Sequence, residues 1–193
     1  MKITLAGSPG SGKSTLRNML AEHYGLKING TGDFMRELSK KYGYSDITKF
    51  IAEYVSEHPE MDLQVDEEQR IFGEENDDFV LDAHLGFHFV PDSIRICLRC
   101  DTAESARRIL EDTKRTTEDA KTFNESIESS VKRREVMHKN YYNLYQVDID
   151  DPDNFDFVLD TTSLSFEEVF KEVTSFIEQR ISKKRSVIRR DNE

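Results

Sequence analysis

Residues 7–14 read GSPGSGKS, and this stretch decides the fold. It follows a short apolar run at residues 3–6 and precedes an amphipathic segment that begins at Lys13. The pattern G-x-x-x-x-G-K-S, between a strand and a helix, is that of a phosphate-binding loop. Its glycines, Gly7, Gly10 and Gly12, let backbone N–H groups approach an anion closely at the start of the helix. The stretch therefore predicts a site for the phosphates of a nucleotide.

Two polar side chains complete the predicted loop. Lys13 is expected to bring a point charge to the β- and γ-phosphates, and Ser14 to supply a hydroxyl ligand for Mg²⁺. The alternative is a glycine-rich turn that precedes Lys-Ser by chance. The order of strand, loop and helix favours the phosphate site over that alternative.

Short apolar runs recur along the chain and predict a sheet. After residues 3–6 they lie at residues 26–28, 79–83, 94–98 and 155–159, with longer helical patterns between them. Short strands separated by helices indicate an α/β fold, with a parallel sheet covered by helices on both faces. Asp101-x-x-Glu104 marks one helix start. Ser165-x-x-Glu168 has the form of a capping box before a helix expected at residues 169–181.

Composition and charge indicate one globular domain, at residues 1–181 of the 193. No apolar run approaches the roughly 18 residues of a membrane span, so we expect a cytoplasmic protein that contacts no membrane. We also expect a monomer. The net charge of −11 argues against nucleic-acid binding by the body of the protein. The C-terminal end carries the opposite charge, since residues 180–193 hold six basic and two acidic side chains. Residues 182–193 are expected to be a flexible tail, either a solvated helix end or a contact for RNA or an acidic partner.

Two segments between the predicted strands are longer than simple connections. Residues 33–76 contain about three helical patterns, with breaks at Tyr42-Gly43 and His58-Pro59. Residues 111–126 are polar and have no apolar period, as expected of a mobile flap.

Charged residues near the predicted strand ends are candidates for an acceptor site and a metal site. Arg36, in the segment Gly32-Asp33-Phe34-Met35-Arg36, would present its guanidinium to a phosphate. The alternative is that Asp33 caps a helix and Arg36 is an ordinary surface residue. Asp82 ends the apolar strand expected at residues 79–82. It is expected to hold Mg²⁺ through a water, a role compatible with capping the next helix.

Arginines flank the polar flap on both sides. Cations around the transferred phosphoryl group stabilise the charge that develops on its oxygens. One arginine from each side, Arg108 and Arg133, is therefore predicted to be catalytic. Further candidates are Arg107, Arg115 and Arg134, and the alternative for each is a solvated helix surface.

Taken in order, GSPGSGKS, GDFMRE, FVLDAHLG, KRRE, YQVDIDD and FDFVLDTT resemble the motifs of nucleoside monophosphate kinases, most closely the archaeal-type cytidylate kinases. The resemblance runs from Met1 to about Gln179. It implies a P-loop NTPase fold with a five-stranded parallel sheet. A helical monophosphate-binding region at residues 33–76 and a lid at residues 111–126 would complete it. It also implies transfer of the ATP γ-phosphate, with Mg²⁺, to CMP or dCMP.

The same resemblance assigns residues to the two substrates. The ATP phosphates would be held by Gly7, Ser8, Pro9, Gly10, Ser11, Gly12, Lys13, Ser14 and Thr15. The acceptor side would be formed by Gly32, Asp33 and Arg36, while Arg108 and Arg133 match lid arginines. One position departs from the family, because His84 stands where the family has an arginine for the acceptor phosphate. A neutral imidazole holds phosphate less well than a guanidinium, although protonation would restore the charge.

Three functions fit these features. The first is a monophosphate kinase for CMP or dCMP. The second is a nucleotide-binding module or slow ATPase that acts on a partner such as RNA or a ribosomal component, for which the basic tail would serve. The third is a kinase of another small metabolite that uses the same donor site. The chain has no Asn-Lys-x-Asp motif, which disfavours a GTPase.

Overall fold

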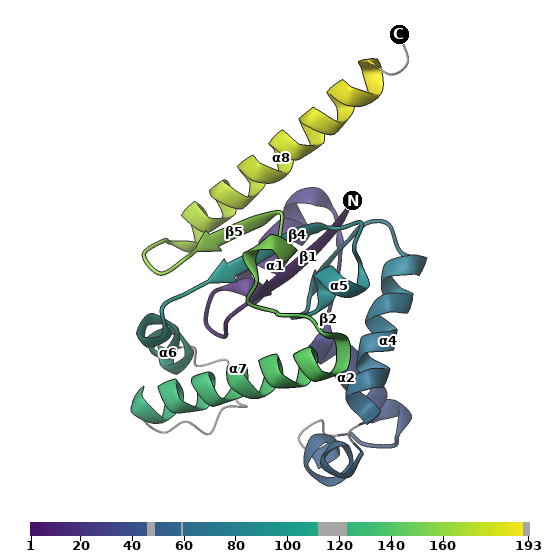
Figure 1. Cartoon of the computed structure of the whole chain (residues 1–193), viewed down its shortest axis with the longest axis vertical. Coiled ribbons are helices and arrows are strands. Elements are labelled where there is room, and N and C mark those ends of the chain that lie inside the picture. The colour runs from purple at the N-terminus through teal and green to yellow at the C-terminus, as the bar shows by residue number, and fades with distance from the viewer. Residues whose placement is uncertain (46–48, 59, 112–122, 191–193) are drawn as a thin grey trace.

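The structure is a computed structural model that describes residues 1–45, 49–58, 60–111 and 123–190 (Figure 1). For parts of the helix at Phe123–Tyr145 and for the last turns of the C-terminal helix, it describes the backbone alone.

A five-stranded parallel sheet forms the centre, in the order β2-β3-β1-β4-β5. Its strands are β1 (Lys2–Gly7), β2 (Lys27–Gly30), β3 (Phe79–Asp82), β4 (Ile94–Arg99) and β5 (Phe157–Asp160). Each lies within a residue or two of an apolar run in the sequence, so the predicted α/β fold with a parallel sheet is confirmed. All five strands run in one direction, and their carboxyl ends therefore meet at one edge.

Helices connect the strands. They are α1 (Lys13–Tyr24), α2 (Thr31–Lys41), α4 (Glu60–Glu75), α5 (Gly86–Phe89), α6 (Thr102–Glu111), α7 (Phe123–Tyr145) and α8 (Phe166–Arg190). Short turns of other helix types lie at η1 (Phe50–Tyr54), η2 (Val55–Glu57) and η3 (Pro152–Asn154). Within the described ranges, no helix has both the length and the apolar character required to cross a membrane.

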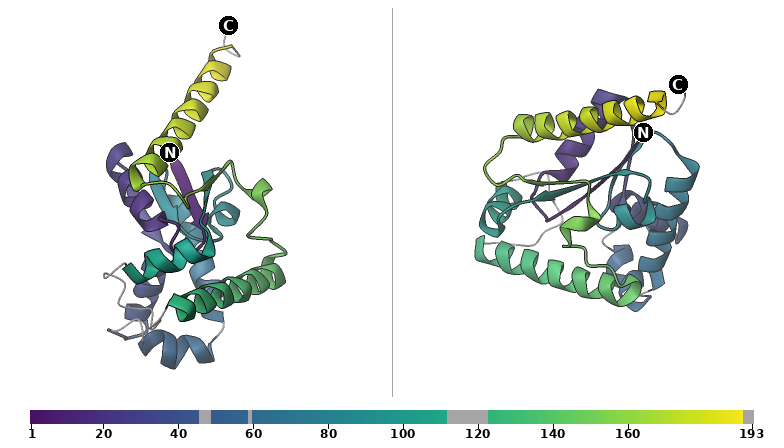
Figure 2. Two further views of the ribbon diagram at one scale, coloured as in Figure 1. Left: turned by 90° about the vertical axis from the view of Figure 1, so that its left-hand side faces the viewer. Right: turned by 45° about the horizontal axis from the view of Figure 1, so that its top comes forward.

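The two faces of the sheet bury different side chains because neighbouring residues of a strand point to opposite sides. On one face, Ile3, Leu5 and Val80 pack against α1 and α8. On the other, Phe79 and Leu81 pack against α2 and α4. Figure 2 shows α8 on one side of the sheet and α7 on the other. The helices thus cover both faces and leave the carboxyl edge of the strands to the connecting loops.

The C-terminal helix has the predicted capping box, begins at Phe166 and ends later than predicted. The Ser165 hydroxyl accepts from the Glu168 N–H at 3.2 Å, and the Glu168 carboxylate accepts from the Ser165 N–H at 2.8 Å. This is the predicted capping box. The helix continues past the predicted end at residue 181 to Arg190, so residues 182–190 are helical. They contain no glycine or proline that would end a helix, and Figure 1 shows this end of α8 projecting beyond the sheet.

Candidate active site

The glycine-rich loop lies between β1 and α1, at the carboxyl edge of the sheet. Gly7, Gly10 and Gly12 have φ values of 139°, 72° and 92°, a region that side chains rarely adopt. The contacts are also close: a Cβ on Gly7 would lie 2.0 Å from the Leu98 carbonyl oxygen, and one on Gly10 would lie 2.7 Å from the Ser105 carbonyl oxygen. Glycine is therefore required at these two positions both by conformation and by space.

Lys13 and Ser8 give the loop its polar groups. The Lys13 ammonium folds back and donates to the Gly7 and Ser8 carbonyls, both at 2.9 Å. The Ser8 hydroxyl is buried and, among the residues described, finds no hydrogen-bond partner. A buried hydroxyl without a partner is costly, so this atom is suited to a polar ligand or a water in the loop.

Ser14 and Asp82 meet across two elements. The Ser14 hydroxyl, in the first turn of α1, donates to the carboxylate of Asp82 at 3.3 Å. Asp82 ends β3, where it pairs in register with Leu5 of β1 on one side and Gly30 of β2 on the other. The structure thus brings together the two residues that the sequence proposes for Mg²⁺, and both offer the oxygen ligands that this ion prefers.

Asp33 and Arg36 lie in the first turns of α2, which follows β2 directly. The Arg36 guanidinium donates to one oxygen of the Asp33 carboxylate and lies over Gly32, where a Cβ would be 3.6 Å from it. The other carboxylate oxygen lies 3.6 Å from a guanidinium nitrogen of Arg17. Asp33 thus lies within the first turn of α2 and pairs with two arginines. The N-cap position of this helix is taken by Gly30, so Asp33 is not the capping residue.

A cavity of about 1010 Å³ opens beside the loop. Its walls come from the loop and α1, from α6, and from the segment between β5 and α8. They include Lys13, Thr15, Arg108, Thr162 and Phe166. This volume is at the upper end of the roughly 300–1,000 Å³ found for small-molecule sites. The cavity therefore has room for a nucleotide whose phosphates lie in the loop.

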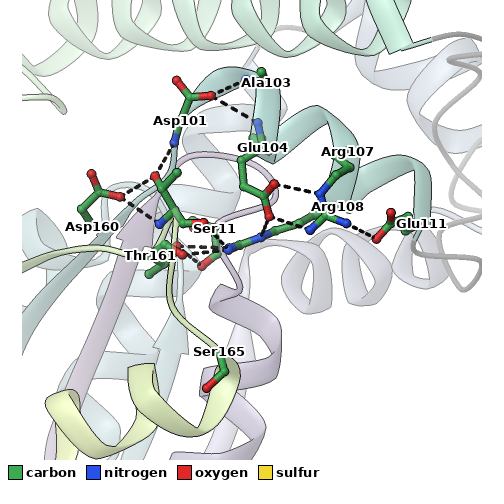
Figure 3. Close-up of polar contacts among 12 residues, drawn as sticks. Ser11, Asp101, Ala103, Glu104, Arg107, Arg108, Glu111, Asp160, Thr161 and Ser165 are labelled. Carbon is green, nitrogen blue, oxygen red and sulfur yellow. Dashed lines mark hydrogen bonds and ion pairs between the residues drawn. The ribbon is translucent and has the colours of Figure 1, made fainter.

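Arg108 fastens α6 to the segment after β5 (Figure 3). Its guanidinium donates to the carbonyls of Thr161 at 2.7 Å and Thr162 at 3.1 Å, and to the Glu104 carboxylate at 2.7 Å. Hydrogen bonds from Arg107 and Arg108 lower the pKa of Glu104 to about 2, which keeps this carboxylate ionised. Arg108 thus lines the cavity and links two segments that form its walls, α6 and the segment after β5.

Replacing Arg108 by Met is expected to lower the free energy of unfolding by about 1–3 kcal/mol, because the partly buried carbonyls and carboxylate lose charged donors. Urea denaturation followed by circular dichroism measures this. The matched control is Arg107→Met, since Arg107 pairs with Glu104 and Glu111 on the exposed side of the same helix. The control is expected to leave the free energy of unfolding nearly unchanged, because ion pairs exposed to solvent contribute little. Equal losses of unfolding free energy in the two variants would contradict the role of Arg108 in linking α6 to the segment after β5.

His84 lies on a different side of the loop from the large cavity. It lines a smaller hollow with Ser8, Arg99, Arg134 and Asp150. Arg134 of α7 pairs with the Asp150 carboxylate, and Arg99 donates to the Asp150 carbonyl at 2.8 Å. The structure therefore groups His84 with these arginines and with the loop.

Other predicted residues fall outside the described part. Arg133 belongs to α7, but its side chain is not described, and residues 112–122 of the proposed lid, with Arg115, also lie outside.

Arg17 and Arg99 are site arginines that sequence reasoning missed. Arg17 comes four residues after Lys13, one helical turn along α1, and this spacing was the available signal. Arg99 ends β4 at the edge where strand ends collect ligand-binding residues, a second usable signal. Neither signal distinguishes these side chains from surface arginines without the positions of β2, α2 and α7.

Known proteins resemble this chain in sequence over most of its length. A family profile described as "AAA domain" matches residues 3–137. A cytidylate kinase of Pyrobaculum islandicum is 32% identical, over 91% of this chain and 91% of its own length. A cytidylate kinase of Methanosarcina barkeri is 30% identical, over 83% of this chain and 87% of its own.

A solved structure shares the fold. The shikimate kinase of Bacteroides thetaiotaomicron superposes with a TM-score of 0.66, over 93% of this chain and 97% of its own, at 14% identity. At that identity the likeness concerns the arrangement of strands and helices.

Proposed function

Because this chain belongs to the archaeal-type cytidylate kinases, a family of P-loop nucleoside monophosphate kinases, we propose that it transfers the γ-phosphate of ATP to CMP or dCMP. The observation that supports this most directly is the contact between Ser14 and Asp82. It joins the phosphate loop to the strand end that pairs with Gly30, the residue before α2, whose first turns carry Asp33 and Arg36. A donor and an acceptor motif thus share one edge of the sheet.

The residues present fit ATP as the donor. The loop has the glycine conformations and the lysine that a triphosphate requires, and the buried Ser8 hydroxyl offers an unused donor there. The adjoining cavity gives the nucleoside a place between α6 and α8. On binding, the Lys13 ammonium would exchange its two carbonyl partners for phosphate oxygens and bring a full charge to them.

The residues also fit Mg²⁺. Ser14 and Asp82 would hold the ion, directly or through water, and the ion would neutralise charge on the phosphates. The role of the protein is then positioning. Lys13 orients the donor, Arg36 binds the acceptor phosphate, and the walls of the cavity exclude water. No side chain needs to form a covalent intermediate, since the acceptor phosphate is itself the nucleophile.

Arg108 and Arg133 are proposed to approach the transferred group from the two sides of the lid. Arg108 borders the donor cavity, which supports this role. Its guanidinium is held by Thr161 and Thr162 in this structure, so the role requires these bonds to be exchanged when the nucleotide binds.

A phosphoryl-transfer assay tests the proposal. Purified protein with ATP and Mg²⁺ is offered CMP, dCMP, UMP, AMP and GMP, and diphosphate products are separated by chromatography. We expect CMP and dCMP to be used at least about tenfold better than the purine nucleotides in kcat/KM, a difference of about 1.4 kcal/mol in transition-state binding. Hydrolysis of ATP without transfer to any of them would overturn the proposal and favour a slow ATPase or a kinase of another metabolite.

A further inference from the structure

Arg17 is an arginine near the phosphate loop to which the proposed reaction gives no role. It lies on α1, one turn after Lys13, and its side chain is 21% exposed. Its guanidinium nitrogen lies 3.6 Å from the Asp33 carboxylate of α2. A long charged side chain that is mostly withdrawn from water loses solvation and side-chain entropy, so this position calls for an explanation.

This guanidinium lies against the backbone of the strand ends. A Cβ on Gly30 would lie 3.4 Å from the same nitrogen of Arg17, and 2.8 Å from the Asp82 carbonyl. Arg17 therefore lies against the carboxyl ends of β2 and β3, next to the residue whose carboxylate contacts Ser14. Because Gly30 has no side chain, the Arg17 guanidinium has room between α2 and the Ser14 and Asp82 pair.

Asp33 joins two guanidinium groups into one cluster. One carboxylate oxygen accepts from Arg36 and the other faces Arg17. The three side chains carry a net charge of +1. Each guanidinium has five N–H donors in a fork. Among the described residues, Arg17 uses its Nε, toward Asn18, and one terminal nitrogen, toward Asp33. Donors therefore remain for an anion, and a shared carboxylate holds both forks in position.

From this geometry we propose that Arg17 binds the phosphate of the acceptor nucleotide together with Arg36, with Asp33 as the positioning residue for both. The inference rests on the proposed function and names the second cation of its acceptor site. A monophosphate dianion suits two arginines because each fork meets two phosphate oxygens. The acceptor phosphate would then lie between α1 and α2, on the side of Asp82 away from the large cavity.

Arg17→Gln tests this with kinetics and with binding. We expect its KM for CMP, and its Kd for CMP without ATP, to rise at least about tenfold, while the KM for ATP changes less than about twofold. Arg17→Lys keeps the charge without the fork and is expected to fall between wild type and Arg17→Gln. The matched control is Arg95→Gln, which removes a partly buried arginine paired with Asp156 in the amino-terminal half of β4.

The outcomes separate the inference from the function on which it rests. Unchanged CMP binding in Arg17→Gln, or equal rises in the KM values for ATP and CMP with a lowered Tm, would mean a structural ion pair and overturn the inference. If wild-type protein binds CMP without phosphorylating it, the proposed function fails, and the Kd series still decides the role of Arg17. Absence of CMP binding by the wild-type protein overturns both.

Discussion

Lys13→Met is expected to reduce the rate of phosphoryl transfer by at least about 100-fold, because it removes a charge aimed at the oxygens that become more negative in the transition state. In a site screened from water such a donor contributes far more than at the surface. The measurement is kcat with saturating ATP and CMP, followed by the binding of ATP alone.

The fold of this variant should persist. In this structure Lys13 donates to the Gly7 and Ser8 carbonyls of its own loop, and the conformation of that loop is also set by its glycines. A suitable control is Lys27→Met, since Lys27 on edge strand β2 donates to the Asn76 side chain at 2.9 Å. The control is expected to keep the wild-type rate, and both variants the wild-type circular dichroism spectrum. A Lys13→Met protein with more than a tenth of the wild-type rate would contradict the proposed donor site.

Gly7→Ala is expected to lower the free energy of unfolding by about 3 kcal/mol or more and to abolish nucleotide binding. Its Cβ would lie 2.0 Å from the Leu98 carbonyl oxygen, which belongs to the β1 and β4 pairing and cannot rotate away. The φ of 139° adds strain for any side chain. The loop must therefore move or β4 must separate, and either change displaces the N–H groups that meet the phosphates.

Gly25→Ala separates the effect of a positive φ from the effect of a close contact. Gly25 ends α1 with a φ of 66°, but a Cβ there would have no heavy atom within 4 Å among the described residues. It is expected to cost only the left-handed conformation, about 1–2 kcal/mol. Urea denaturation and the fluorescence of a bound ATP analogue measure both variants. Equal stabilities would mean that the close approach of Gly7 to Leu98 does not constrain the loop.

The elements of this fold are predictable because their signals are local. A loop such as GSPGSGKS specifies its own turn, its strand and the start of its helix within a few residues. The capping box at Ser165 and Glu168 is equally local, since three residues suffice for both hydrogen bonds. The end of α8 was less predictable: without a glycine or proline after residue 181, only packing and solvent set the last turn.

The pairing of Ser14 with Asp82 could be foreseen from a general rule. In a parallel sheet the carboxyl ends of neighbouring strands meet at one edge, so a carboxylate ending the third apolar run must come near the loop. The surroundings of the arginines follow no such rule. Arg108 turned out to hold Thr161 and Thr162, while Arg134 holds Asp150.

The sequence by itself determined the phosphate loop, the parallel sheet and the family, because these depend on short motifs and on short apolar runs separated by helical patterns. Only the tertiary structure decided that Arg17 meets Asp33, that His84 lies with Arg99 and Arg134, and that a large cavity opens between α6 and α8. The direction of a long side chain depends on neighbours distant in the chain, and these meet only when strand order and helix packing bring them together.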